Sequence, residues 1–183
     1  MDVYETCPRF SSARFLLRQT ELADCDDLLK VYSDRKAVPI FNKDNCTGDF
    51  YMTRREDMEN CIRFWLSEYS QRYYVRWSVI HRETAQAVGT IELFRRTAAD
   101  HFNGVGLLRL DLRSDYEAED VITELLTTLL PPCQELFGCE GFATKAPPCA
   151  PERRTALAAL GFRPSPEKLY GHDGTAYGDY WET

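Results

Sequence analysis

Hydrophobic and polar residues alternate near the middle of the chain, and the period of the pattern then changes. Every second residue of 108–112 is a leucine, and charged residues stand between, which is typical of a strand with one apolar face. Over 121–130 the apolar residues recur at helical spacing, and Pro131-Pro132 is expected to stop or kink that helix. The pattern therefore predicts a buried strand that leads into a helix through one short turn.

The turn between this strand and this helix is acidic and contains no glycine. Ser114 and Glu117 have the spacing of a capping box, which predicts that the helix begins near Asp115. Strand-turn-helix units often hold an anion, because free N–H groups and the positive end of the helix dipole meet there. The acidic side chains either cap and solvate the helix or line a ligand site: Asp115, Glu117, Glu119 and Asp120.

The same patterns predict the rest of the chain as one domain over residues 1–183. Residues 1–12 are expected to be a loose arm, and residues 33–50 a loop. Three further helices are predicted, one opening at 20–24, one capped by Thr53 and one over 151–160 that ends at Gly161. Strands are predicted at 14–19, 73–81, 87–94 and 139–145, with a final hairpin over 166–181 that turns at Asp173-Gly174. The order β-α-α-β-β-β-α-β-α-β-β predicts an α/β (α+β) fold with a mixed, mostly antiparallel sheet flanked by helices.

Composition and charge narrow the classes of function. The chain has 183 residues, 44% of them hydrophobic, and a net charge of −7, so we expect a substantial core and no nucleic-acid partner. No apolar run reaches membrane-spanning length, and the first residues lack the apolar core of a signal peptide, so a cytoplasmic protein without membrane contact is expected. The seven cysteines and three histidines show no metal-ligand spacing, which favours reduced, mostly buried thiols and no metal site.

Four stretches resemble a known family when they are taken in order. They are FLLRQTELADCDDLLKVYSD at 15–34, WSVIHRETAQAVGTIELF at 77–94, TELL at 123–126 and ALAALGF at 156–162. Residues 14–165 resemble the GNAT superfamily of acyl-CoA-dependent N-acetyltransferases, and within it the subgroup that acetylates the N-termini of ribosomal proteins. The resemblance implies acetyl-CoA as the acyl donor and a small-molecule or peptide amine as the acceptor, in a monomer or homodimer.

The resemblance also implies where the donor binds. In that family the thioester lies between the fourth and fifth strands, the fourth strand pairs with the pantetheine arm, and the following turn holds the pyrophosphate. The fourth strand corresponds to residues 107–113 here. The residues that the resemblance places at the donor are Leu110, Asp111, Leu112, Tyr116, Glu117, Ala118, Glu119, Asp120, Val121, Ile122 and Thr123.

The turn departs from the family signature Arg/Gln-x-x-Gly-x-Gly/Ala, which aligns with residues 117–122. Glu117 stands at the basic position, and Asp120 and Ile122 stand at the glycine positions. Each carboxylate at about 6 Å from a phosphate costs about 0.7 kcal/mol per unit charge in water. The sequence therefore predicts a weakened pyrophosphate site, to which the side chain of Ile122 adds a steric obstacle.

The family often uses a carboxylate on a central strand as the general base. Glu92 and Asp111 are the candidates here, and either one is alternatively an ordinary strand residue. The family's tyrosine acid falls at Leu157, and the subgroup's Asn and Ser fall at Ala150 and Arg153. Two functions remain open: an acetyltransferase with an atypical CoA site, or an inactive GNAT-fold module that senses a ligand or binds a protein.

Overall fold

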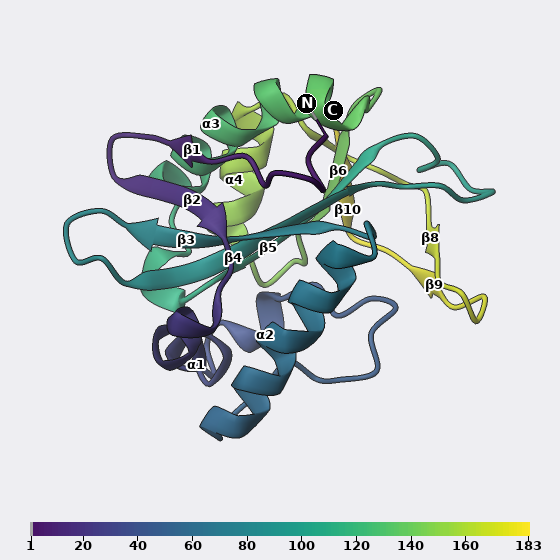
Figure 1. The fold of residues 1–183 in the computed structure, drawn as a ribbon. Coiled ribbons are helices and arrows are strands. Elements are labelled where there is room, and N and C mark those ends of the chain that lie inside the picture. Colours follow the sequence, from purple (N-terminus) through teal and green to yellow (C-terminus); the bar gives the residue numbers. More distant parts are fainter. Residues whose placement is uncertain (1) are drawn as a thin grey trace.

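The computed structural model describes residues 2–183 and is built around one eight-stranded sheet (Figure 1). The strand order is β1-β2-β3-β4-β5-β6-β10-β7, and every neighbouring pair is antiparallel except β5 with β6. The strands are β1 Phe10–Ser11, β2 Phe15–Gln19, β3 Val75–His81, β4 Ala87–Arg95, β5 Gly106–Leu112, β6 Phe142–Lys145, β7 Arg163–Pro164 and β10 Tyr180–Glu182. A separate small sheet pairs β8 Leu169–Tyr170 with β9 Ala176–Tyr177.

Helices cover both faces of the large sheet. In Figure 1, α3 and α4 lie above the sheet, while α1 and α2 lie below it. The helices are α1 Cys25–Tyr32, α2 Arg55–Ser70, α3 Glu119–Phe137 and α4 Pro151–Ala159, with single 3-10 turns at Leu22–Asp24, Val38–Ile40 and Ser114–Tyr116. This architecture confirms the predicted mixed, mostly antiparallel sheet flanked by helices, and the predicted element order holds from β2 to α4.

The alternation in β5 sends its side chains to opposite faces of the sheet. Leu108, Leu110 and Leu112 are buried in the core that also contains the apolar side of α3. The side chains between them, Arg109 and Asp111, face the side of α1, because successive residues of a strand point to opposite faces. The apolar period therefore also decides which charged groups become buried on the other side.

The predicted start of α3 is wrong. Residues 114–116 form a 3-10 turn, and α3 begins at Glu119 with Ala118 as its N-cap and no side-chain cap. The amide of Ser114 donates to Asp34 Oδ2 at 2.8 Å, so it is held by a distant loop rather than by a capping box. The helix also does not stop at Pro131-Pro132, since it continues to Gly138, whose φ of 62° ends it.

The segment expected to be a loose arm packs against the sheet. β1 pairs with β2, and the Val3 side chain is buried. The indole Nε1 of Trp77 donates to the carbonyl oxygen of Pro8 at 2.8 Å, and the hydroxyl of Tyr69 donates to the carbonyl oxygen of Val3 at 2.9 Å. The residues before β1 therefore cover one end of the core.

The predicted hairpin is present only in part. β8 and β9 pair around Gly174, which has a φ of 82°, but residues 180–182 leave the hairpin and enter the large sheet between β6 and β7. All seven cysteines are free, and Cys149 is the exposed one among them. Within residues 2–183, the helices are too short or too polar to cross a membrane.

Candidate functional site

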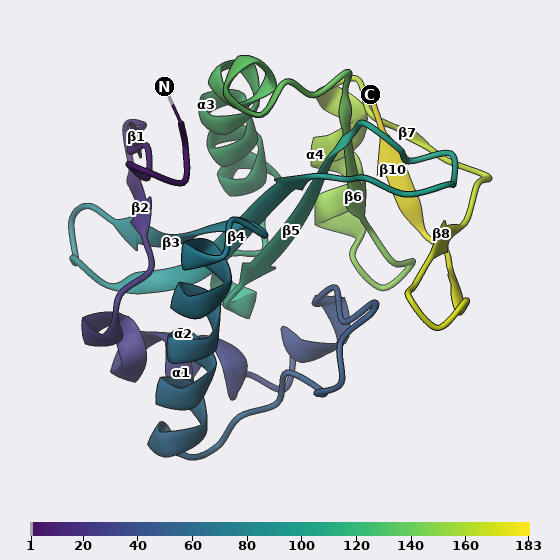
Figure 2. The ribbon, with the colours of Figure 1, turned by 45° about the vertical axis from the view of Figure 1, so that its right-hand side comes forward.

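The two parallel strands β5 and β6 separate part-way along their length. Their pairing ends at Leu108 and Thr144, whereas β5 stays paired with β4 as far as Leu112. Figure 2 shows β5 and β6 diverging beyond this point. We call this separation the β5–β6 split.

The backbone of β5 presents hydrogen-bonding groups to this split. The amide of Arg113 donates to the carbonyl oxygen of Val88, and the amide of Arg96 donates to that of Val105, so odd-numbered residues of this segment pair with β4. Alternate residues of an antiparallel strand point their N–H and C=O groups to the opposite edge. Leu110 and Leu112 therefore direct these groups toward the split, where they fit an extended ligand chain.

The acidic turn after β5 is largely neutralised by arginines. Asp115 pairs with Arg113 at 2.6 Å, Glu117 with Arg153 at 2.7 Å, and Asp120 with Arg14 at 2.8 Å. Hydrogen bonding to Arg14 lowers the pKa of Asp120, which therefore stays charged. The repulsion predicted from four free carboxylates is consequently too large, because three of the four have a cationic partner.

The first turn of α3 nevertheless carries carboxylates on its exposed side. Glu119 and Asp120 are exposed, and the amide of Glu119 lies 3.4 Å from Oε2 of Glu152, so a carboxylate of the chain already faces this helix end. A shallow surface hollow of about 600 Å³ lies here, lined by Ala118, Glu119, Asp120, Thr123, Glu124 and Glu152. Its acidic lining opposes an anion despite the helix dipole.

Ile122 is not the steric obstacle that the alignment suggested. Its side chain is fully buried in the core with that of Val121, and its amide donates to the carbonyl oxygen of Ala118 at 3.0 Å. The helix therefore already uses the Ile122 amide, and the side chain points away from solvent. Ile122 helps to anchor α3 to the sheet rather than to shape a ligand site.

Both predicted catalytic carboxylates lie in a buried charged cluster on the α1 side of the sheet. Arg76 of β3 is at its centre, stacked on the ring of Trp65 with 4.1 Å between the guanidinium carbon and the ring centroid. Glu92 and Asp111 are each 1% exposed, and Arg76 is 4% exposed. Although burial disfavours its charge, the adjacent anions raise the pKa of Arg76, with Glu92 the largest contributor.

Glu92 is held on both of its oxygens. Nη2 of Arg76 donates to Oε2, and Nη1 of Arg109 lies 3.5 Å from Oε1. Both oxygens of this buried carboxylate are therefore occupied by arginine side chains. The arrangement gives Glu92 the role of an anchor for the two arginines.

Asp111 has one free oxygen. Its Oδ2 accepts a hydrogen bond from the Tyr32 hydroxyl at 2.8 Å and lies 3.4 Å from Nη1 of Arg76, whereas Oδ1 has no partner within residues 2–183. Burial raises the pKa of Asp111, and the neighbouring Arg76 only partly opposes this. Of the two predicted carboxylates, Asp111 is the one with an oxygen that no described residue contacts.

A loop between α1 and α2 closes the split from the side of these carboxylates. Asp44 in this loop is buried, and its carboxylate accepts hydrogen bonds from Lys145 Nζ at 2.6 and 2.7 Å and from the Tyr180 hydroxyl at 3.0 Å. Nη2 of Arg109 donates to the carbonyl oxygen of Asp44 at 2.9 Å. The loop is therefore attached to β5, β6 and β10 around the split.

Sequence reasoning missed the arginines and the tyrosine that partner these carboxylates. Arg76 had a usable signal, since an arginine in the centre of an apolar strand needs a buried anion. Tyr32 had none, because it looks like any apolar residue of a helix stripe. Within the described part of the chain, histidine, cysteine and carboxylate side chains form no cluster that could hold a metal ion.

A model of the acetyltransferase (GNAT) domain matches residues 14–163. The chain belongs to the GNAT acetyltransferase family. A search of curated proteins finds no match. That β5 and β6 flank the thioester and that residues 117–122 hold the pyrophosphate stay predictions.

Solved structures share the GNAT fold at low sequence identity. A Vibrio cholerae protein assigned as a ribosomal-protein-serine acetyltransferase is 14% identical, with 97% of each chain covered and a TM-score of 0.71. A ribosomal-protein-S5-alanine acetyltransferase from Vibrio fischeri is 15% identical, with 96% of this chain and 94% of that chain covered and a TM-score of 0.69. The microcin C7 self-immunity acetyltransferase, solved with acetyl-CoA and AMP, is 11% identical, with 94% and 93% covered and a TM-score of 0.69. At these identities the likeness shows the fold.

Proposed function

We propose that this GNAT protein transfers an acetyl group from acetyl-CoA to a primary amine of a small molecule or peptide. The β5–β6 split carries the proposal, because the backbone groups of Leu110 and Leu112 face it where the family places the pantetheine arm. The structural relative solved with acetyl-CoA supports this choice of donor.

In this proposal, the site binds the pantetheine arm of acetyl-CoA better than its diphosphate. The arm can pair with β5, but the turn offers no free cation to the diphosphate, since Arg14, Arg113 and Arg153 are each bound to a carboxylate. Charge-assisted hydrogen bonds from free arginines are the usual strong contacts to phosphate. We therefore expect weaker binding of acetyl-CoA than a turn with the family signature would give.

Asp111 is the general base of the proposed reaction. The amine nitrogen attacks the thioester carbonyl carbon, the carbon–sulfur bond breaks, and the sulfur leaves as a thiolate. The proton lost by the nitrogen passes to Oδ1 of Asp111 through a bridging water, because the carboxylate itself is buried. Leu157, at the family's tyrosine position, has no hydroxyl with which to protonate the thiolate.

Calorimetric titration with acetyl-CoA tests the donor, and mass spectrometry of a panel of amines and N-terminal peptides tests the transfer. We expect saturable binding and a mass gain of one acetyl group on at least one amine class. A wild-type protein that neither binds acetyl-CoA nor acetylates any amine of the panel contradicts the proposal.

One observation favours a second function, an inactive module that binds a ligand or protein. The helix end that would receive the diphosphate faces Glu152, a carboxylate of the chain itself. Under this alternative, acetyl-CoA has no effect on the unfolding temperature. Acetyl-CoA at a hundred times its dissociation constant would otherwise add about 2.7 kcal/mol to stability.

A further inference from the structure

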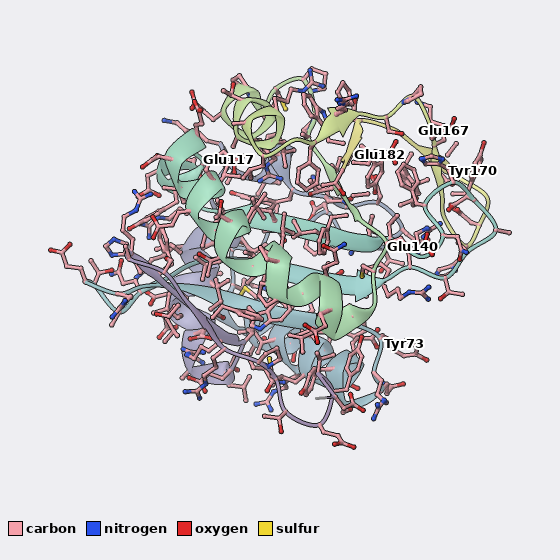
Figure 3. All side chains as sticks on the ribbon, turned by 90° about the horizontal axis from the view of Figure 1, so that it is seen from above. Tyr73, Glu117, Glu140, Glu167, Tyr170 and Glu182 are labelled. Carbon is pink, nitrogen blue, oxygen red and sulfur yellow. The ribbon has the colours of Figure 1, made fainter. Side chains whose placement is uncertain are left out.

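A second buried ion pair lies at the end of the β5–β6 split. Nε and Nη2 of Arg153 donate to Oε1 and Oε2 of Glu117 at 2.7 and 2.8 Å, and the two side chains are 1% and 7% exposed. Glu117 belongs to the turn that follows β5, and Arg153 to the first turn of α4, which follows β6. Figure 3 shows Glu117 between the beginning of α3 and α4. The pair therefore joins the chain segments that leave the two diverging strands.

Arg153 faces the sheet rather than solvent. Leu157 is one helical turn further on and is buried in the same core as Leu110 and Leu112, and residues four apart lie on one face of a helix. The charge of Arg153 also acts on Asp111 of β5, whose pKa it helps to lower against the effect of burial. The guanidinium therefore lies between α4 and Glu117, in the chain that follows β5.

One nitrogen of the Arg153 guanidinium makes no hydrogen bond to the described residues. Glu117 occupies Nε and Nη2, while Nη1 is buried and has no hydrogen-bond partner within residues 2–183. A buried donor without a partner costs about 1 to 3 kcal/mol, so this nitrogen calls for an acceptor that residues 2–183 do not supply. The pair as a whole is neutral, because each side chain cancels the charge of the other.

We propose that Arg153 is a specificity-determining residue of the donor site, whose Nη1 donates a hydrogen bond to a carbonyl oxygen of the acyl-pantetheine arm. Glu117 neutralises the charge of Arg153, so this charge does not attract the diphosphate. This inference rests on the proposed function. A neutral ion pair favours a neutral carbonyl oxygen as its hydrogen-bond acceptor. A diphosphate near Arg153 would also be repelled by the Glu117 carboxylate. The acyl donor is then recognised by its thioester arm, and its nucleotide contributes little.

The test compares acetyl-CoA with S-acetylpantetheine, which has the same arm and no diphosphate. We expect the wild type to bind the two donors with dissociation constants within about fivefold of each other, because the arginines near the turn are paired with carboxylates and leave the diphosphate without a cationic partner. Glu117→Gln keeps the shape of the pair and frees the charge of Arg153, so acetyl-CoA affinity rises about tenfold while S-acetylpantetheine affinity stays unchanged. Glu119→Gln removes the same charge from the same turn without freeing an arginine, and it controls for general electrostatics.

A double variant tests the hydrogen bond itself. Glu117→Leu with Arg153→Met replaces the pair by apolar side chains of similar size, which avoids leaving a buried charge alone. We expect S-acetylpantetheine affinity to fall about tenfold, the value of one hydrogen bond to a charged group. If the double variant has a higher KM than the wild type and the same kcat, Arg153 binds an amide carbonyl of the arm. If the double variant has a lower kcat, Arg153 binds the thioester carbonyl. Both outcomes support the proposal.

The outcomes separate this inference from the function on which it rests. If the wild type binds both donors and the folded double variant binds S-acetylpantetheine equally well, Arg153 has no such role, although the acetyltransferase stands. If the wild type prefers acetyl-CoA more than a hundredfold, the claim about the diphosphate is wrong. If the wild type binds neither donor, the proposed function fails and this inference fails with it. Thermal melts of each variant establish that it is folded.

Discussion

At the scale of single residues, the two predicted carboxylates differ in what surrounds them. Glu92 and Asp111 occupy neighbouring strands and are equally buried, but arginines contact both oxygens of Glu92 and only one oxygen of Asp111 is bound. A free oxygen and a pKa raised by burial suit a base, whereas a doubly paired carboxylate suits a structural role. Mutation of each residue should therefore affect a different property.

Asp111→Asn should remove the base and leave the site intact. We expect kcat to fall about 100-fold, with acetyl-CoA affinity within about twofold of the wild type. Because burial raises the pKa of Asp111, wild-type activity should rise with pH through a value above the ordinary aspartate range of about 3.9, and the variant should lose this limb. Steady-state rates across pH check this, and an unchanged acidic limb in the variant would show that another group is the base.

The same pKa has a consequence for stability, with a defined sign. A carboxyl group whose pKa is higher in the folded state stabilises the fold at low pH and loses that contribution as pH rises through the folded pKa. Relative to the wild type, Asp111→Asn should therefore become more stable as the pH increases. Urea unfolding at several pH values measures the difference.

Glu92→Gln should act on stability instead. It leaves Arg76 and Arg109 with one buried carboxylate fewer, and breaking one side of a buried ion pair costs about 3 to 5 kcal/mol. The expected result is a loss of about 3 kcal/mol in the free energy of unfolding, measured by urea denaturation. Glu83→Gln, which changes an exposed turn, is the matched control and should stay within about 0.5 kcal/mol. Equal stability of the two variants would argue against the anchoring role.

At the scale of elements, long-range contacts decided where several segments begin and where they pack. The start of α3 moves to Glu119 because residues 114–116 form a separate turn, in which the Ser114 amide bonds to Asp34 in the loop after α1. The segment before β1 is ordered by contacts with β3 and α2 rather than by a pattern of its own. Neither partner is close in sequence, so local rules did not find them.

Removal of residues 1–9 should expose the end of the core that they cover. The truncation removes the buried Val3 side chain and the carbonyl of Pro8 to which Trp77 donates, so we expect a loss of about 3 kcal/mol in the free energy of unfolding. Tryptophan fluorescence should shift to longer wavelength, because Trp77 is otherwise fully buried. Pro8→Ala keeps this carbonyl and should behave like the wild type. A truncated chain with unchanged stability would show that the segment contributes nothing.

At the scale of the whole molecule, net charge and ion pairing determine whether an anionic donor is attracted or repelled. The chain has a net charge of −7, and the arginines nearest the turn after β5 are already paired with carboxylates. An ordinary nucleotide site attracts its ligand through free cations, and salt weakens that attraction. In this protein, the attraction should be absent.

Salt should therefore not weaken acetyl-CoA binding. Between about 50 mM and 500 mM NaCl, we expect the dissociation constant to stay level or to decrease, since screening reduces repulsion between like charges. Calorimetry at both salt concentrations measures it. S-acetylpantetheine lacks the diphosphate and serves as the comparison, because its affinity should be independent of salt. A tenfold loss of acetyl-CoA affinity at high salt would indicate that arginines leave their carboxylates to bind the diphosphate.

The sequence by itself determined the order of the elements from β2 to α4, the faces of β5 and the family. Apolar periodicity is local, so alternating leucines at 108–112 predict both a strand and its buried side wherever the strand lies. The register also placed Asp111 on the face opposite those leucines, whereas the choice between Glu92 and Asp111 as the candidate base stayed open in the sequence.

Only the tertiary structure decided which charges are paired. Arg76 lies 35 residues from Asp111, and Arg153 lies 36 residues from Glu117, yet these separations place opposite charges in contact inside the protein. The energy of a buried charge depends on the atoms around it in space, whereas a sequence pattern reports only neighbours along the chain. For this reason the turn after β5 reads as a row of free carboxylates in the sequence. In the structure, three of them are held by arginines, one just before β2, one in α4 and one in the turn itself.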